Sequence, residues 1–166
     1  MSLFRFTTIA MLLLAAAPAS ALRGVEAGAP CAGLSEIEAA LGSKLRGSSD
    51  EQKTGEANVY FDGFFHGKVA SISYTCEAGA VERQIIDVRF ADEHEALVYF
   101  SDRHRELSEQ FGPPHKDPDE PRIAEIADAT GVPVRRFATW VLGERVVSLM
   151  LSPEDEKQWQ VLISGP

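Results

Sequence analysis

The sequence lacks the short motifs that mark common enzyme chemistries. Its two cysteines form no C-x-x-C pair, and no group of residues has the spacing of a zinc site. There is no glycine-rich phosphate loop and no G-x-S-x-G turn of the kind that presents a catalytic serine. These absences make an enzyme the less favoured class, and we predict no catalytic residue, no metal and no cofactor.

Positive charge is also scarce. The chain has 16 Lys and Arg against 25 Asp and Glu, which gives a formal charge of -9. Non-specific binding to nucleic acids or to anionic lipids depends on contacts between basic side chains and phosphates. We therefore expect no nucleic-acid partner.

A hydrophobic run long enough to span a bilayer is missing as well. The most apolar stretch, residues 9–17, is well short of the roughly 20 residues that a transmembrane helix needs. It follows an early cation, Arg5, and precedes the small-residue triplet 19–21. This order is typical of a secretory signal peptide with cleavage after Ala21. A membrane anchor is the alternative interpretation.

Removal of residues 1–21 would leave 145 residues and a formal charge of -10, because Arg5 is lost. That length suits one domain with a substantial core, over residues 22–166. We expect this domain to be periplasmic or secreted, with no transmembrane segment after removal of the signal.

The two cysteines, Cys31 and Cys76, predict an intramolecular disulfide, because export carries the chain into an oxidising compartment. A thiol pair that binds metal and a redox couple are the alternatives. In the chain-entropy model a bridge of this span stabilises the fold by roughly 3–4 kcal/mol.

One long amphipathic helix is predicted over residues 92–114. Steps of three and four residues place apolar side chains and one histidine on a single face, and Gly112 and the two prolines after it end the helix. That face comprises Ala96, Leu97, Phe100, His104, Leu107 and Phe111.

A short helix is predicted over residues 33–42. Ser35 has the position to cap it and Glu38, three residues later, completes a capping box, while Ile37 and Leu41 belong to its apolar side. The polar residues 43–56 that follow are interpreted as a flexible loop.

The rest of the chain is interpreted mainly as strands. Residues 57–65 and 68–76 form a hairpin with its turn at His66-Gly67, although Asp62-Gly63 is an alternative turn that would change which of Phe64 and Phe65 faces water. Further strands are expected at 81–90, 135–142, 145–151 and 158–163, and a short helix at 121–129.

Together these elements predict an α+β domain. It has an antiparallel sheet of about six strands, with the long and the short helix on one face and the disulfide joining the N-terminus to the second strand. Each half of the chain has a helix ending at glycine, then a hairpin and a third strand, so an α-β-β-β tandem pseudo-repeat is a further hypothesis.

The capping motif Gly33-x-Ser35-x-x-Glu38, the helix that closes at Leu41-Gly42 and the aromatic hairpin segment 65–69 carry a resemblance. They are similar to exported small α+β proteins of the BLIP and SmpA/BamE-like class. The resemblance implies protein binding, as an inhibitor or as an assembly factor of the envelope. It covers about the first third of the mature chain.

The hairpin concentrates aromatic residues, because Tyr60, Phe61, Phe64 and Phe65 lie close together. A strand with one buried face hides only alternate side chains, and exposed aromatic patches are typical of recognition surfaces. We therefore predict a partner-binding site at Tyr60, Phe64, Phe65 and His66. The alternative is that these rings pack under residues 43–56.

Three functions remain open at this point. The first is a protein-binding module of inhibitor, immunity or envelope-assembly type, whose partner is another exported or envelope protein. The second is a carrier of a small ligand or lipid, in a helix–sheet pocket lined by Phe100, Trp140 and Trp159. The third is a hydrolytic enzyme centred on His104, although a core or rim histidine is the more common role for that position.

Overall fold

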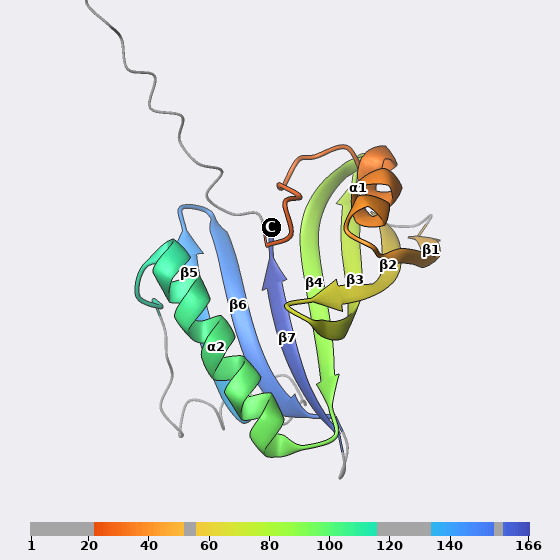
Figure 1. Ribbon diagram of the computed structural model, residues 1–166. Helices are drawn as coiled ribbons and strands as arrows, with labels where there is room; N and C mark the ends of the chain where they lie inside the picture. Colours follow the sequence, from red (N-terminus) through yellow and green to blue (C-terminus); the bar gives the residue numbers. More distant parts are fainter. Residues whose placement is uncertain (1–21, 52–55, 116–133, 155–157) are drawn as a thin grey trace, which may run out of the picture.

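The computed structural model describes residues 22–51, 56–115, 134–154 and 158–166. It shows an α+β fold in which seven antiparallel strands form one sheet (Figure 1). The elements are a 3-10 turn η1 (Cys31–Gly33), α1 (Leu34–Ala40), β1 (Lys44–Glu51), β2 (Glu56–Phe65), β3 (Lys68–Glu77), β4 (Ala80–Phe90), α2 (Glu93–Phe111), β5 (Arg136–Leu142), β6 (Arg145–Pro153) and β7 (Trp159–Gly165).

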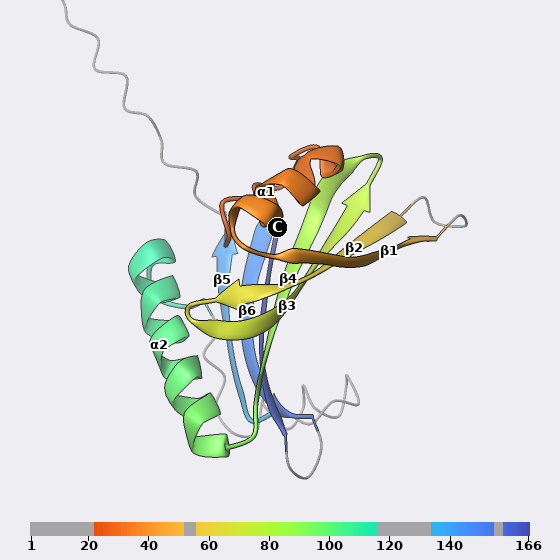
Figure 2. The same ribbon diagram turned by 45° about the vertical axis from the view of Figure 1, so that its right-hand side comes forward.

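The strands follow the order β1-β2-β3-β4-β7-β6-β5. Each half of the chain is a helix followed by a meander of neighbouring strands, and the two meanders meet where β4 pairs with β7. Both helices lie on the same side of the sheet, as predicted (Figures 1 and 2). This arrangement agrees with the tandem pseudo-repeat, although among the described residues the first half has one more strand than the second.

That additional strand is β1, which pairs with β2 along Lys44–Glu51. The prediction of a flexible loop over residues 43–56 is wrong for this part of the segment. The glycine and serine residues of β1 have little strand propensity of their own. The strand forms because β2 offers it a hydrogen-bonding edge, and this long-range cause leaves no local pattern.

The long helix is confirmed. Asp92 caps α2 by accepting a hydrogen bond from the Glu95 backbone N–H at 2.9 Å, and Gly112 ends it with a φ of 86°. The helix packs on β4, β5, β6 and β7. Its buried residues include Phe100 and Leu107 from the predicted face and also Tyr99, which that face omitted.

The short helix forms, but its predicted capping box is wrong. The N-cap is Gly33, no side chain caps it, and Ser35 is exposed. Glu38 points into the protein and is fully buried, whereas Ile37 is 37% and Leu41 46% exposed. The helix is therefore rotated about its axis relative to the prediction, because buried polar side chains bind Glu38.

The hairpin turn is at His66-Gly67, where both residues have positive φ, 48° and 77°. Phe65 therefore pairs with Lys68 across a two-residue turn. The alternative turn at Asp62-Gly63 does not form, because both residues continue β2. Gly63 is needed for packing instead, since a Cβ there would lie 2.1 Å from Ser43 Oγ.

The disulfide between Cys31 and Cys76 is confirmed. It joins η1 to β3. This is the strand that the sequence predicts as the second, and it is the third in the structure because β1 precedes it. Next to it, Gly28 donates its N–H to the Val81 carbonyl at 2.7 Å and Val81 donates to Ala29 at 2.9 Å. The N-terminal segment is thus held against the edge of β4.

The three last strands follow the predicted ranges, and Val161 and Ile163 of β7 are buried on the helix side of the sheet. The short helix predicted over residues 121–129 falls outside the described residues. Within the described ranges, no helix has the length and apolar character needed to cross a bilayer.

Candidate functional site

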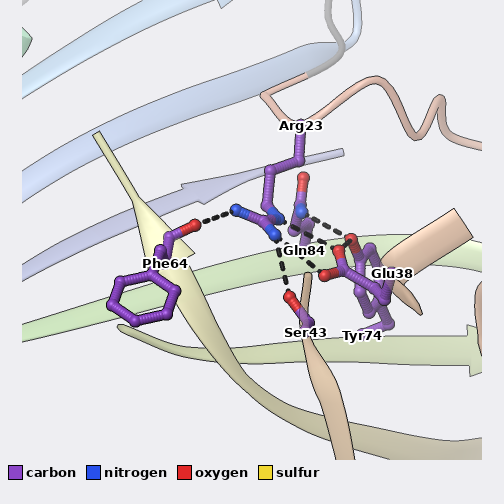
Figure 3. Close-up of polar contacts among 6 residues, drawn as sticks. All are labelled: Arg23, Glu38, Ser43, Phe64, Tyr74 and Gln84. Carbon is purple, nitrogen blue, oxygen red and sulfur yellow. Dashed lines mark hydrogen bonds and ion pairs between the residues drawn. The ribbon is translucent and has the colours of Figure 1, made fainter. Parts of the chain in front are cut away.

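The most unusual feature of the interior is a cluster of polar side chains, which we call the Arg23 cluster (Figure 3). Arg23 binds Glu38 through two hydrogen bonds, from Nε to Oε1 and from Nη2 to Oε2, both 3.0 Å long. Its Nη2 also donates to Ser43 Oγ at 2.9 Å. Tyr74 Oη donates to Glu38 Oε1 at 2.5 Å, and Gln84 Nε2 donates to Tyr74 Oη at 2.8 Å.

Burial alone raises the pKa of the Glu38 carboxyl, since the charged form loses its water. Hydrogen bonds from Arg23, Ser43 and Tyr74 oppose this effect, and so does the positive charge of the guanidinium. The net pKa of the carboxyl lies below its ordinary value. Burial and the bond to Glu38 raise the pKa of Tyr74. Glu38 is therefore a carboxylate and Tyr74 a neutral donor, which suits a structural ion pair.

The Arg23 cluster also fixes the end of β2. Arg23 Nη1 donates to the backbone carbonyl of Phe64 at 2.5 Å. The ladder between β1 and β2 ends at the pair Lys44 and Asp62, so β1 does not reach this carbonyl. The guanidinium satisfies it in place of a strand and connects the N-terminal segment to the aromatic hairpin.

The four residues of the predicted partner-binding site divide between two faces. The Phe64 side chain is 58% exposed, on the sheet face opposite the described helices, beside its cross-strand partner Val69, which is 70% exposed. Tyr60 is half-buried under the Arg46 guanidinium, 5.4 Å from the ring centre. Phe65 is buried and belongs to the core, while His66 is exposed in the turn.

The hairpin tip is anchored to α2 on the other side. Tyr99 Oη donates to the Phe65 carbonyl at 3.2 Å, and His66 Nε2 lies 3.5 Å from Glu106 Oε1. Arg103 binds the same Glu106. Partial burial and the charge of Arg103 lower the pKa of His66, and the Glu106 carboxylate offsets part of this effect.

His104 lies between two aromatic rings. Its ring centre is 6.2 Å from that of Phe100 and 5.5 Å from that of Trp140. Trp140 is itself held by a hydrogen bond from Nε1 to the Gly112 carbonyl, 3.0 Å long. The histidine is half-buried beside these rings, which fits a position at the rim of the core.

Two of the cavities among the described residues bear on the carrier hypothesis. A small one of about 30 Å³ lies between the hairpin tip and α2 and includes Phe65 and Leu107. A shallow groove of about 580 Å³ lies beyond the end of β7 and includes Arg83 and Arg145. Neither is lined by Phe100, Trp140 or Trp159, the residues named for a ligand pocket.

Sequence reasoning did not identify the Arg23 cluster. Arg23 lies between the predicted signal peptide and the first predicted helix, and Glu38 is predicted as part of a capping box. One signal was available, because Gln84 occupies the same face of its strand as Ile86 and Val88. A polar residue at a buried position of a strand requires a hydrogen-bond partner in the interior.

Comparisons with known proteins add no identity: no family model, no curated protein and no solved structure matches the chain. In the part of the chain that the structure describes, no three His, Cys, Asp or Glu side chains come together to form a metal site.

Proposed function

We propose that this chain is an exported protein-binding module of inhibitor, immunity or envelope-assembly type, and that the outward face of the β2–β3 hairpin binds its partner. The observation that carries the proposal is the pair Phe64 and Val69. These are adjacent apolar side chains, 58% and 70% exposed, on a face of the sheet that no described helix covers.

Rigidity supports recognition at this place. The backbone of the hairpin is held by Arg23 at Phe64 and by Tyr99 at Phe65. A surface that is already ordered loses little conformational entropy when a partner binds, which favours affinity. Tyr60 and its cation-π contact with Arg46 extend the same face.

Export is part of the proposal. The apolar run at 9–17 and the small residues at 19–21 support a signal peptide that is cleaved after Ala21. The disulfide between Cys31 and Cys76 supports an oxidising compartment, the periplasm or the exterior. The resemblance to the BLIP and SmpA/BamE-like class supports the same kind of role.

A pull-down from envelope extract tests the proposal. We expect wild-type protein to retain a partner that the double variant Phe64→Ala/Val69→Ala loses. The matched control is Val141→Ala/Val146→Ala, because this cross-strand pair is also exposed and occupies the same place beside its own turn. Equal recovery of every bound protein by the wild type and both variants would contradict the proposal.

A further inference from the structure

The two edges of the sheet differ. At the β5 edge, the carbonyl of Thr139 accepts a hydrogen bond from the His115 backbone N–H at 2.7 Å. At the β1 edge, β2 is the only backbone partner among the described residues. No strand of the described ranges therefore pairs with the outer backbone donors and acceptors of β1.

The register shows which groups these are. Phe65 and Lys68 close a two-residue turn, so odd-numbered residues of β2 bond to β3 and even-numbered ones face β1. The bond from Arg23 to the Phe64 carbonyl agrees with this alternation. Ser48, opposite Val59, therefore directs its N–H and C=O away from the sheet.

An apolar flank continues this edge on the helix side. Ile37 of α1 and Leu41, the C-cap residue of that helix, are 37% and 46% exposed, and Leu45 at the start of β1 is 58% exposed. Leu45 lies opposite the buried Phe61, so it is on the same side of the sheet as α1, which packs against β1. With Glu38 turned inward, Ile37 and Leu41 stay exposed.

One cation completes the surface. Lys44 is exposed next to Leu45 and makes no ion pair with another described residue, in contrast to Arg46, which binds Asp62 at 3.4 Å. The chain as a whole is acidic, with a formal charge of -9. Lys44 has Asp62 as its cross-strand partner and therefore lies on the sheet face opposite Leu45. A bound strand with a carboxylate on that face would bring it next to Lys44.

We propose that β1 binds an extended segment of another protein, with apolar side chains at alternate positions and a carboxylate beside Lys44. An extended chain is the occupant because only it matches the hydrogen-bonding groups of a strand edge. The apolar flank then covers every second side chain. This inference rests on the proposed function in that the partner is a protein, but it uses a surface distinct from Phe64 and Val69.

The test uses a displayed library of random twelve-residue peptides, selected on the mature protein. We expect enriched sequences that alternate apolar and polar residues and carry Asp or Glu near one end. Selection on the Lys44→Glu variant should enrich Lys or Arg at that end instead. Peptides without alternation, or an acidic preference that survives Lys44→Glu, would overturn the proposal.

Ser48→Pro provides the sharpest variant, because it removes an outward N–H and leaves the β1–β2 ladder intact. We expect it to weaken peptide binding about tenfold, with Ser48→Ala binding as wild type. The double variant Leu41→Glu/Leu45→Glu changes exposed positions and should also weaken binding. It replaces Ser48→Pro in the test if Ser48→Pro does not fold. Unchanged binding in either folded variant contradicts strand addition.

Two controls separate the alternatives. Phe64→Ala/Val69→Ala should bind the selected peptides normally, so failure of the hairpin proposal and failure of this one are distinguishable. Sedimentation should show that the wild-type protein does not dimerise through β1. A dimer formed in that way would be abolished by Ser48→Pro. Such a dimer would identify a second copy as the occupant and overturn the proposal.

Discussion

Arg23 and Glu38 form a bidentate ion pair with 6% and 0% of their side chains exposed. The pair joins the N-terminal segment to α1, and the other bonds of Arg23 reach Ser43 and the end of β2. One guanidinium thus connects segments that are distant in the sequence. The orientation of α1, and with it the exposure of Ile37 and Leu41, depends on this contact.

Single substitutions in this pair should be strongly destabilising. Arg23→Met leaves a buried carboxylate without its charge partner, and Glu38→Leu does the same to the guanidinium, so each should lower the free energy of unfolding by about 3–5 kcal/mol. The double variant should lose less than the sum. Urea denaturation measures all three, and additive losses would show that the pair is not coupled.

The exposed pair Arg46 and Asp62 is the matched control for that experiment, because its side chains are 51% and 57% exposed. Arg46→Met should change the free energy of unfolding by less than about 1 kcal/mol, since solvent screens the pair. A loss as large as that of Arg23→Met would mean that burial does not decide the effect.

Acid should weaken the fold through Glu38. Its pKa in the folded protein is lower than the ordinary value of 4.5, so the unfolded chain takes up a proton first as pH falls. The stabilisation is complete above pH 4.5 and is lost as pH falls through the folded pKa. The difference in unfolding free energy between wild type and Glu38→Gln, followed by denaturation from pH 6 to 3, should therefore shrink at the acid end.

Protonation of His66 should lower the stability of the fold in a higher pH range than protonation of Glu38 does. Its pKa is lowered below the ordinary value of 6.5 by burial and by Arg103, so the folded protein favours the neutral ring. Stability is then complete above pH 6.5 and falls as pH drops through the folded pKa. Proton NMR titration should show that Arg103→Met raises this pKa. An unchanged pKa would contradict the role of Arg103.

Phe64 and Phe65 are adjacent but should respond differently to truncation. Phe65→Ala removes a buried ring and should lower the free energy of unfolding by about 3–5 kcal/mol. Phe64→Ala removes an exposed ring and should change it by about 0.5 kcal/mol or less. Thermal unfolding of the two variants measures the contrast, and a reversed order would mean that the register of the hairpin is wrong.

The disulfide should account for a large share of the stability. It links residues 45 positions apart, for which chain entropy predicts about 4 kcal/mol. The Cys31→Ala/Cys76→Ala variant should unfold at correspondingly lower urea concentration, and reduction of the wild type should have a similar effect. If reduction leaves the unfolding midpoint unchanged, the bridge contributes nothing to stability.

Several elements were predictable because their causes are local. The apolar spacing of α2 and its ends at Asp92 and Gly112 lie within one stretch of chain. The positive φ angles at His66 and Gly67 follow from turn residues beside the paired strands. The Cys31–Cys76 bridge could be predicted because the chain has two cysteines and an N-terminal composition that predicts export.

The sequence by itself determined the α+β class, the long helix, the hairpins and the disulfide. Tertiary structure alone decided that Lys44–Glu51 becomes a strand, because its bonds belong to β2. It also decided that Glu38 turns inward, because Arg23 and Tyr74, 15 residues before it and 36 after, meet its carboxylate. Both proposed binding surfaces depend on these long-range contacts, since pairing and burial determine which apolar side chains remain exposed.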